Sequence, residues 1–158
     1  MQWSQDSQAL EKAAALAHKA IALDESIPSA HQLLGQVYLF QKRHEQATAE
    51  AERAVTLVPN DAENYLWLGW ILNYAGQPEK GIATIEQAMR LNPRYPPNYS
   101  LALGQAYRLL GRHEEAIIAL KTTLSRNPNL SAAYLPLAAA YSALDREEGS
   151  TGGGSRTL

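Results

Sequence analysis

The sequence predicts an all-α fold of stacked antiparallel helix pairs, and three observations lead to that prediction. A short segment with a small central residue recurs as LLGQVY (33–38), WLGWIL (67–72), LALGQAY (101–107) and PLAAAY (136–141). The small residue advances by 34, 35 and 34 residues, at Gly35, Gly69, Gly104 and Ala138. Sustained apolar–polar alternation, which is typical of strands, is missing. A fixed period of this length indicates a helical repeat array.

Each full unit is expected to hold two helices joined by a tight turn. The expected helices cover residues 29–41 and 44–57, 62–75 and 78–91, and 97–110 and 113–126. Gly76 and Gly111 lie at two of the turns, and a proline follows each second helix, where it stops the helix. The one extra residue falls in RYPPNY (94–99), where a loop accepts an insertion at little cost.

The array is expected to be incomplete at both ends. Residues 7–28 have the pattern of a second helix, and residues 131–145 have that of a first helix, in which Pro136 predicts a kink or a late start. The expected domain is therefore one repeat array over residues 1–148, followed by a flexible Gly/Ser-rich tail, a linker or expression remnant, over residues 149–158. Its expected parts are a partial repeat 1–27, full repeats 28–61, 62–96 and 97–130, and a partial repeat 131–148.

The repeated positions resemble the tetratricopeptide repeat family. The first unit matches at Leu34, Gly35, Tyr38, Ala47, Ala54 and Pro59, the second at Tyr65, Leu68, Gly69, Ala88 and Pro93, and the third at Leu103, Gly104, Tyr107, Ala116 and Pro128. The resemblance implies a right-handed superhelical solenoid of about eight helices. Three departures, Gly81, Ser100 and Thr123, are expected to loosen packing locally.

Composition narrows the classes of function. The 14 Lys and Arg residues against 16 Asp and Glu residues give a net charge of −2, so a basic face for nucleic acid is not expected. No apolar run approaches the roughly 18 residues of a membrane span, and MQWSQDSQAL (1–10) lacks the features of a secretory signal. The absence of cysteine excludes thiol chemistry and favours a cytoplasmic location. The four histidines lack metal-ligand spacing and no phosphate loop occurs, so no catalysis, metal or cofactor is expected.

The segment YLWLGWILNYAG (65–76) carries more apolar surface than one helix contact needs. At about 100° per residue, Tyr65 and Leu68 face the partner helix, whereas Trp70 and Tyr74 face away. The resemblance places ligands on that far side of the first helices, which lines the concave surface. The predicted peptide-binding residues are Gln36, Phe40, Leu66, Trp67, Trp70, Asn73, Tyr74, Gln105, Arg108 and Leu109.

Two structural explanations of the aromatic residues stay open. In the first explanation, Trp67 packs against a neighbouring first helix. In the second, Trp70 and Tyr74 cover each other and Phe40, and no ligand is involved. The favoured function is a protein-binding scaffold or adaptor that takes an apolar or amphipathic peptide. The alternatives are self-assembly, a homodimer included, through uncovered ends that contain Leu137, Tyr141 and Leu144, and a regulatory segment of a larger bacterial enzyme.

Overall fold

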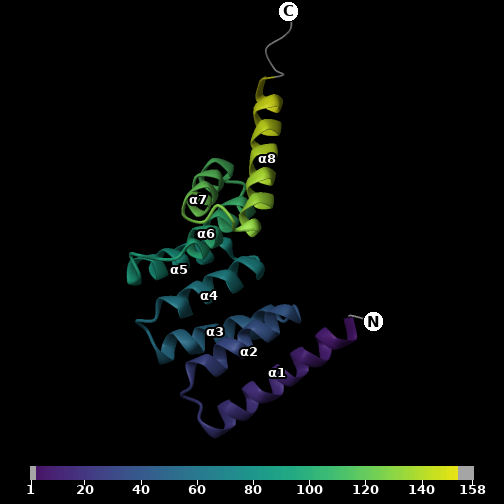
Figure 1. Ribbon diagram of the computed structural model, residues 1–158, viewed down its shortest axis with the longest axis vertical. Helices are drawn as coiled ribbons and strands as arrows, with labels where there is room; N and C mark the ends of the chain where they lie inside the picture. Colours follow the sequence, from purple (N-terminus) through teal and green to yellow (C-terminus); the bar gives the residue numbers. More distant parts are fainter. Residues whose placement is uncertain (1–2, 153–158) are drawn as a thin grey trace, which may run out of the picture. The chain divides into compact units, whose positions relative to one another are not determined.

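A computed structural model describes the backbone of residues 3–152 and the side chains of residues 7–151 (Figure 1). The chain divides into two compact units, Met1–Pro93 and Arg94–Leu158, called unit 1 and unit 2 here. Unit 1 contains α1 (Trp3–Leu23), α2 (Pro28–Phe40), α3 (His44–Leu57), α4 (Ala62–Tyr74) and α5 (Pro78–Leu91). Unit 2 contains α6 (Pro97–Leu109), α7 (His113–Arg126), the short 3-10 helix η1 (Ser131–Ala133) and α8 (Tyr134–Gly152).

Helices that follow one another in the chain pack as antiparallel pairs. In unit 1, α2 packs on α3 and α4 on α5, while α1 packs on α2 and α3 on α4. In unit 2, α6 packs on α7 and α7 on α8. No strand occurs in residues 3–152. These findings confirm the predicted all-α class of helix pairs, and the six paired helices start and end within one residue of the expected bounds.

Small residues at the middle of each pair let the two helices approach closely. A methyl group at Gly35 would lie 3.3 Å from the carbonyl oxygen of Ala47, and one at Gly69 would lie 2.4 Å from Ile85 Cγ1. A methyl group at Gly81 would lie 2.1 Å from Asn73 Oδ1. Gly81 therefore makes room for the buried Asn73 amide, and the expectation that it only loosens the packing is wrong.

The other two departures from the family pattern compensate for each other. Ser100 on α6 and Thr123 on α7 are both buried, and their hydroxyl oxygens are 2.9 Å apart. The carbonyl oxygens of Pro97 and Ala119 lie 3.0 Å from Ser100 Oγ and from Thr123 Oγ1, respectively. Each hydroxyl has one proton, so one of the two donates to the other hydroxyl, which in turn donates to its own main-chain carbonyl. The two residues thus join α6 to α7 by a hydrogen bond instead of leaving a loose contact.

The last helix starts late and runs further than expected. η1 precedes α8, and Pro136 is the third residue of α8, in the first turn, where its missing N–H breaks no helical hydrogen bond. α8 continues to Gly152, so residues 149–152 are helical and do not belong to a flexible tail. The remaining tail residues, 153–158, lie outside the described residues.

Candidate functional site

The surface of unit 1 carries aromatic side chains at the ends of two adjacent helices. Phe40 is the last residue of α2 and Tyr74 is the last residue of α4, and these two helices contact each other. Phe40 is 71% exposed and Tyr74 is 56% exposed. The ring of Trp70 stacks on that of Tyr74, with centroids 6.2 Å apart and planes at 17°. We call Phe40, Trp70 and Tyr74 the aromatic face.

The stacked pair follows from helical geometry, because residues at i and i+4 lie on the same side of a helix. Stacking covers part of Trp70, which is partly exposed, as Trp67 also is. It does not cover Tyr74, which keeps more than half of its surface in solvent. Gln36, one turn before Phe40 on α2, is partly exposed and adds an amide.

Burial removes two of the predicted residues from this surface. Leu66 is 1% exposed and Asn73 is 3% exposed, so neither is available to a ligand. Asn73 Oδ1 points at Gly81, between α4 and α5. At the repeat position of Leu66, Gln32 on α2 donates a hydrogen bond to Asn64 on α4, so in the pair α2–α3 this position faces α4.

Unit 2 carries a smaller and more polar patch on α6. Leu109 is 50% exposed, and Gln105 and Arg108 are partly exposed. The Nε atom of Arg108 is buried and makes no hydrogen bond within the described residues. The patch therefore offers an amide, a cation and one aliphatic side chain.

The residues proposed for self-association divide between two faces of α8. Leu137 and Leu144 pack against the buried cluster of Ala116, Ile117 and Ala140. Tyr141 is 44% exposed. All three were expected to be partly uncovered. Leu137 and Leu144 are partly exposed, because a spacing of seven residues puts both on the side that faces α7, and Tyr141 is the most exposed of the three.

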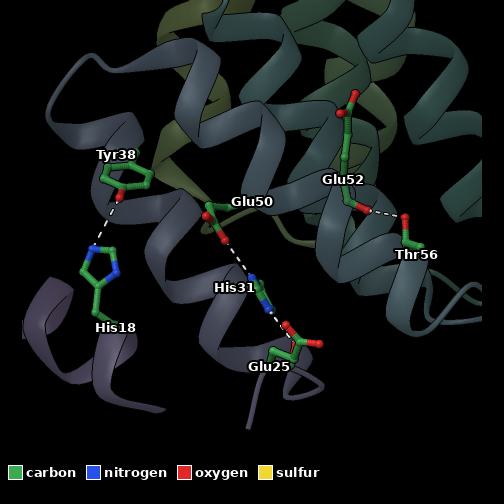
Figure 2. A network of polar contacts seen from close by, with 7 residues as sticks. All are labelled: His18, Glu25, His31, Tyr38, Glu50, Glu52 and Thr56. Carbon is green, nitrogen blue, oxygen red and sulfur yellow. Dashed lines mark hydrogen bonds and ion pairs between the residues drawn. The ribbon is translucent and has the colours of Figure 1, made fainter. Parts of the chain in front are cut away.

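A buried polar network in unit 1 was not foreseen from the sequence (Figure 2). His31 on α2 is 6% exposed; its Nδ1 lies 2.6 Å from Glu50 Oε2 on α3, and its Nε2 lies 3.0 Å from the carbonyl oxygen of Glu25. His31 thus ties the α1–α2 loop and both helices of the pair together. His113, expected on the surface, is likewise covered, with its side chain 13% exposed and its Nε2 3.4 Å from Glu147 Oε1 on α8.

A cleft of about 780 Å³ lies beside the α2–α3 turn and was also missed. Its lining is mostly polar, and it does not include the aromatic face; the lining residues are Lys42, Arg43, His44, Glu45, Gln46, Thr48, Ala49, Glu52, Ala75 and Gln77. At this turn Lys42 has a φ of 60°, where the other two turns have Gly76 and Gly111. In the part of the chain that the structure describes, no helix is long and apolar enough to cross a membrane.

Antiparallel helix pairs at a fixed period, with aromatic side chains left on an open surface, define a helical-repeat protein. The chain belongs to the tetratricopeptide repeat family, since models of that repeat match residues 28–61 and 66–131, which together exceed half of the chain. Proteins of this family generally mediate protein–protein interactions. Among curated proteins, none matches the chain.

Solved structures with the same fold include three tetratricopeptide repeat proteins. The MamA protein is 24% identical over 95% of this chain and 82% of its own, with a TM-score of 0.71. TTC0263, a thermophilic TPR protein of Thermus thermophilus, is 21% identical over 87% of this chain and 75% of its own, with a TM-score of 0.75. YrrB, described as a TPR protein with an unusual peptide-binding site, is 22% identical over 91% of this chain and 74% of its own, with a TM-score of 0.65. At these identities the likeness shows the fold alone.

Proposed function

We propose that this chain is a scaffold or adaptor whose aromatic face binds an apolar or amphipathic peptide of a partner protein. The observation that carries the proposal is the exposure of Phe40 and Tyr74, at 71% and 56%, at the ends of two helices that contact each other. Large exposed apolar groups that gather in one place commonly mark an interaction surface. The resemblance to family members with ligands on this side of the first helices supports the same choice.

The chemistry of the aromatic face suits a helix or an extended segment with apolar anchors. Trp and Tyr supply much of the binding energy at protein interfaces, because they bury large areas at a small cost in conformational entropy. Gln36 adds an amide that donates and accepts hydrogen bonds at the edge of these rings. YrrB, which shares the fold, is described as having a peptide-binding site, and this is consistent with the proposal.

The patch on α6 is proposed as a separate ligand-contacting surface of unit 2. Arg108 there is partly exposed and would pair with a carboxylate or a backbone carbonyl of a ligand, because a guanidinium donates strong hydrogen bonds to such oxygens. Leu109 and Gln105 would contact aliphatic and polar parts of that ligand.

The test begins with a peptide selected from a displayed random library against the wild-type chain. We expect Tyr74→Ser combined with Phe40→Ser to weaken binding of that peptide by about 30-fold or more, because both side chains belong to the proposed anchor set. Both residues are exposed in the free chain, so the double variant should fold normally, as circular dichroism would show. Trp67→Phe separates the two explanations of Trp67, because a purely structural tryptophan should leave the affinity unchanged.

The matched control is Ile118→Ser. Ile118 lies on α7 and is 67% exposed, close to the value for Phe40, but it is outside the aromatic face. It should leave the affinity unchanged. A folded double variant that binds the peptide as tightly as the wild type would contradict the proposal.

A further inference from the structure

The three complete helix pairs show how a first helix contacts its second helix. The small residue at the middle of the first helix lies against the backbone of the second helix: Gly35 against Ala47, and Gly104 against Ala116. One turn earlier on α2, His31 contacts Glu50 on α3. This alignment of the two helices is a property of the repeat, so it can be applied to α1 and α8, which have no such partner within residues 3–152.

α8 has the pattern of a first helix and α1 has that of a second helix. The repeat step places Ala138 of α8 at the position of Gly104, and Ala13 of α1 at the position of Ala47. If α1 were the second helix for α8, Ala138 would meet Ala13, and Tyr134 would meet Leu16, as His31 meets Glu50.

The two helix surfaces that this alignment would bring together are exposed to solvent in the structure. On α8, Tyr134 is 51% exposed and Tyr141 is 44% exposed, and Ala138 between them is also exposed. On α1, Leu16 is 66% exposed and Leu23 is 79% exposed. The spacings of four and seven residues put each set on one side of its helix. Both helices therefore present an apolar stripe of the kind that the complete pairs bury.

The lengths of the two helices match in the same arrangement. α3 begins three residues before Ala47, whereas α1 begins ten residues before Ala13. α6 ends five residues after Gly104, whereas α8 ends 14 residues after Ala138. In an antiparallel pair, the extra residues at the start of α1 would run beside the extra residues at the end of α8, so both extensions would be covered together.

From the alignment, the exposed stripes and the matched extensions, we infer that α1 of one copy docks on α8 of another copy as its second helix. The contact joins two different surfaces, so it is head-to-tail, and repeated contacts build linear chains or a ring. The inference goes beyond the proposed function, because none of its residues belongs to the aromatic face.

The first test is the mass of the wild-type chain by light scattering over about a hundredfold range of concentration, since association follows mass action. We expect the mass to rise from one chain toward several, and Leu16→Asp to hold it at one chain. The matched control is Ile118→Asp, because Ile118 is 67% exposed, as Leu16 is at 66%, but lies on α7. It should associate as the wild type does.

The second test changes the stripe of α8. Tyr141→Asp should also hold the mass at one chain, because Tyr141 is 44% exposed and belongs to the stripe that α1 would cover. An equal mixture of Leu16→Asp and Tyr141→Asp should form two-chain complexes and nothing longer, because each variant keeps one intact stripe. A wild-type mass of one chain at every concentration overturns the inference. So does association that Leu16→Asp leaves intact, because the contact would then lie elsewhere.

Discussion

The helix pairs α2–α3 and α6–α7 have the same arrangement, and three of the equivalent positions at which they differ change a polar contact or a turn. In each pair a tyrosine on the first helix receives an arginine from the turn: the guanidinium carbon lies 4.5 Å from the ring centroid for Arg43 over Tyr38, and 4.7 Å for Arg112 over Tyr107. The pair α2–α3 has His31, Lys42 and Gln46 at these three positions. The pair α6–α7 has Ser100, Gly111 and Glu115 there.

The first difference shows what the interface between paired helices requires. His31 reaches a carboxylate on α3, and Ser100 reaches a hydroxyl on α7, so both polar side chains are matched across the pair. The identity of the residue can therefore vary as long as its partner varies with it. An unmatched group would lose its hydrogen bonds to water without replacement, which is costly in a buried place.

The largest effect is expected for His31→Ala. The variant loses two hydrogen bonds and leaves a gap between α2 and α3, and we expect a loss of about 2–3 kcal/mol in the free energy of unfolding of unit 1. The value stays below that of a fully buried ion pair, because the Glu50 side chain is 25% exposed and can turn to water. All three tryptophans of the chain lie in unit 1, so denaturant unfolding followed by tryptophan fluorescence measures this unit.

The control for that prediction is Glu50→Gln, which keeps an acceptor for His31 while removing the charge. It should cost less than His31→Ala. Equal losses for the two variants would show that the charge of Glu50, and not the hydrogen-bonded contact, holds the pair together.

A smaller effect is expected at the matching position of α6–α7. Ser100→Ala and Thr123→Val should each cost about 1 kcal/mol, because the hydroxyl that remains in each variant can donate to its own main-chain carbonyl. The double variant should cost less than the sum of the two, since neither hydroxyl is left facing an apolar group. Hydrogen exchange of α6 and α7 amides gives these values for unit 2. Additive losses would mean that the two hydroxyls do not interact.

The sequence predicts the helices well because their signals are local. Gly76 and Gly111 mark turns with φ of 76° and 71°, and the prolines that follow α3, α5 and α7 mark the ends of the pairs. The Ser100–Thr123 bond was missed for the opposite reason. Each residue alone departs from the family pattern, and only the folded structure shows that the two side chains form a hydrogen bond with each other.

The sequence predicted which side of the helix carries the candidate site, but it did not predict correctly which residues are exposed there. A 100° rotation per residue identifies the side of α4 that faces away from α5, and it correctly leaves Tyr74 exposed. It cannot say that Leu66 is buried, because helical rotation gives a direction and does not say which other elements pack there. Asn73 lies near the edge of the predicted stripe, and its burial depends on Gly81, which is eight residues along the chain.

A still smaller effect is expected at the turns. Lys42 holds a φ of 60°, where the equivalent Gly111 has 71°, and a side chain in this region costs about 1–2 kcal/mol. Glycine relieves that strain but adds freedom to the unfolded chain, so Lys42→Gly should stabilise unit 1 by about 0.5–1 kcal/mol. The reciprocal change, Gly111→Lys, should destabilise unit 2. Denaturant midpoints measure both, and a Lys42→Gly chain that is less stable than the wild type would indicate that the lysine makes a stabilising contact at the turn.

The smallest expected effect is on the pH dependence of stability, in which Gln46 and Glu115 should differ. Each accepts a hydrogen bond from the arginine of its turn, Arg43 and Arg112 respectively, but only Glu115 titrates. The hydrogen bond from Arg112 is the main reason that the pKa of Glu115 lies below its ordinary value of 4.5, because the bond favours the charged form.

A lowered folded-state pKa fixes the sign of the pH dependence. The stabilisation by Glu115 is fully present above pH 4.5 and is lost as the pH falls through the lower value of the folded state. Glu115→Gln should therefore flatten the stability of unit 2 between about pH 6 and about pH 3, whereas Gln46→Glu should introduce a similar slope in unit 1. The expected change is small because Glu115 is exposed, so it is read as the difference between each variant and the wild type. If Gln46→Glu left the pH profile of unit 1 unchanged, the two arginine turns would not be equivalent, and the shared arrangement of the two pairs would stop at their tyrosines.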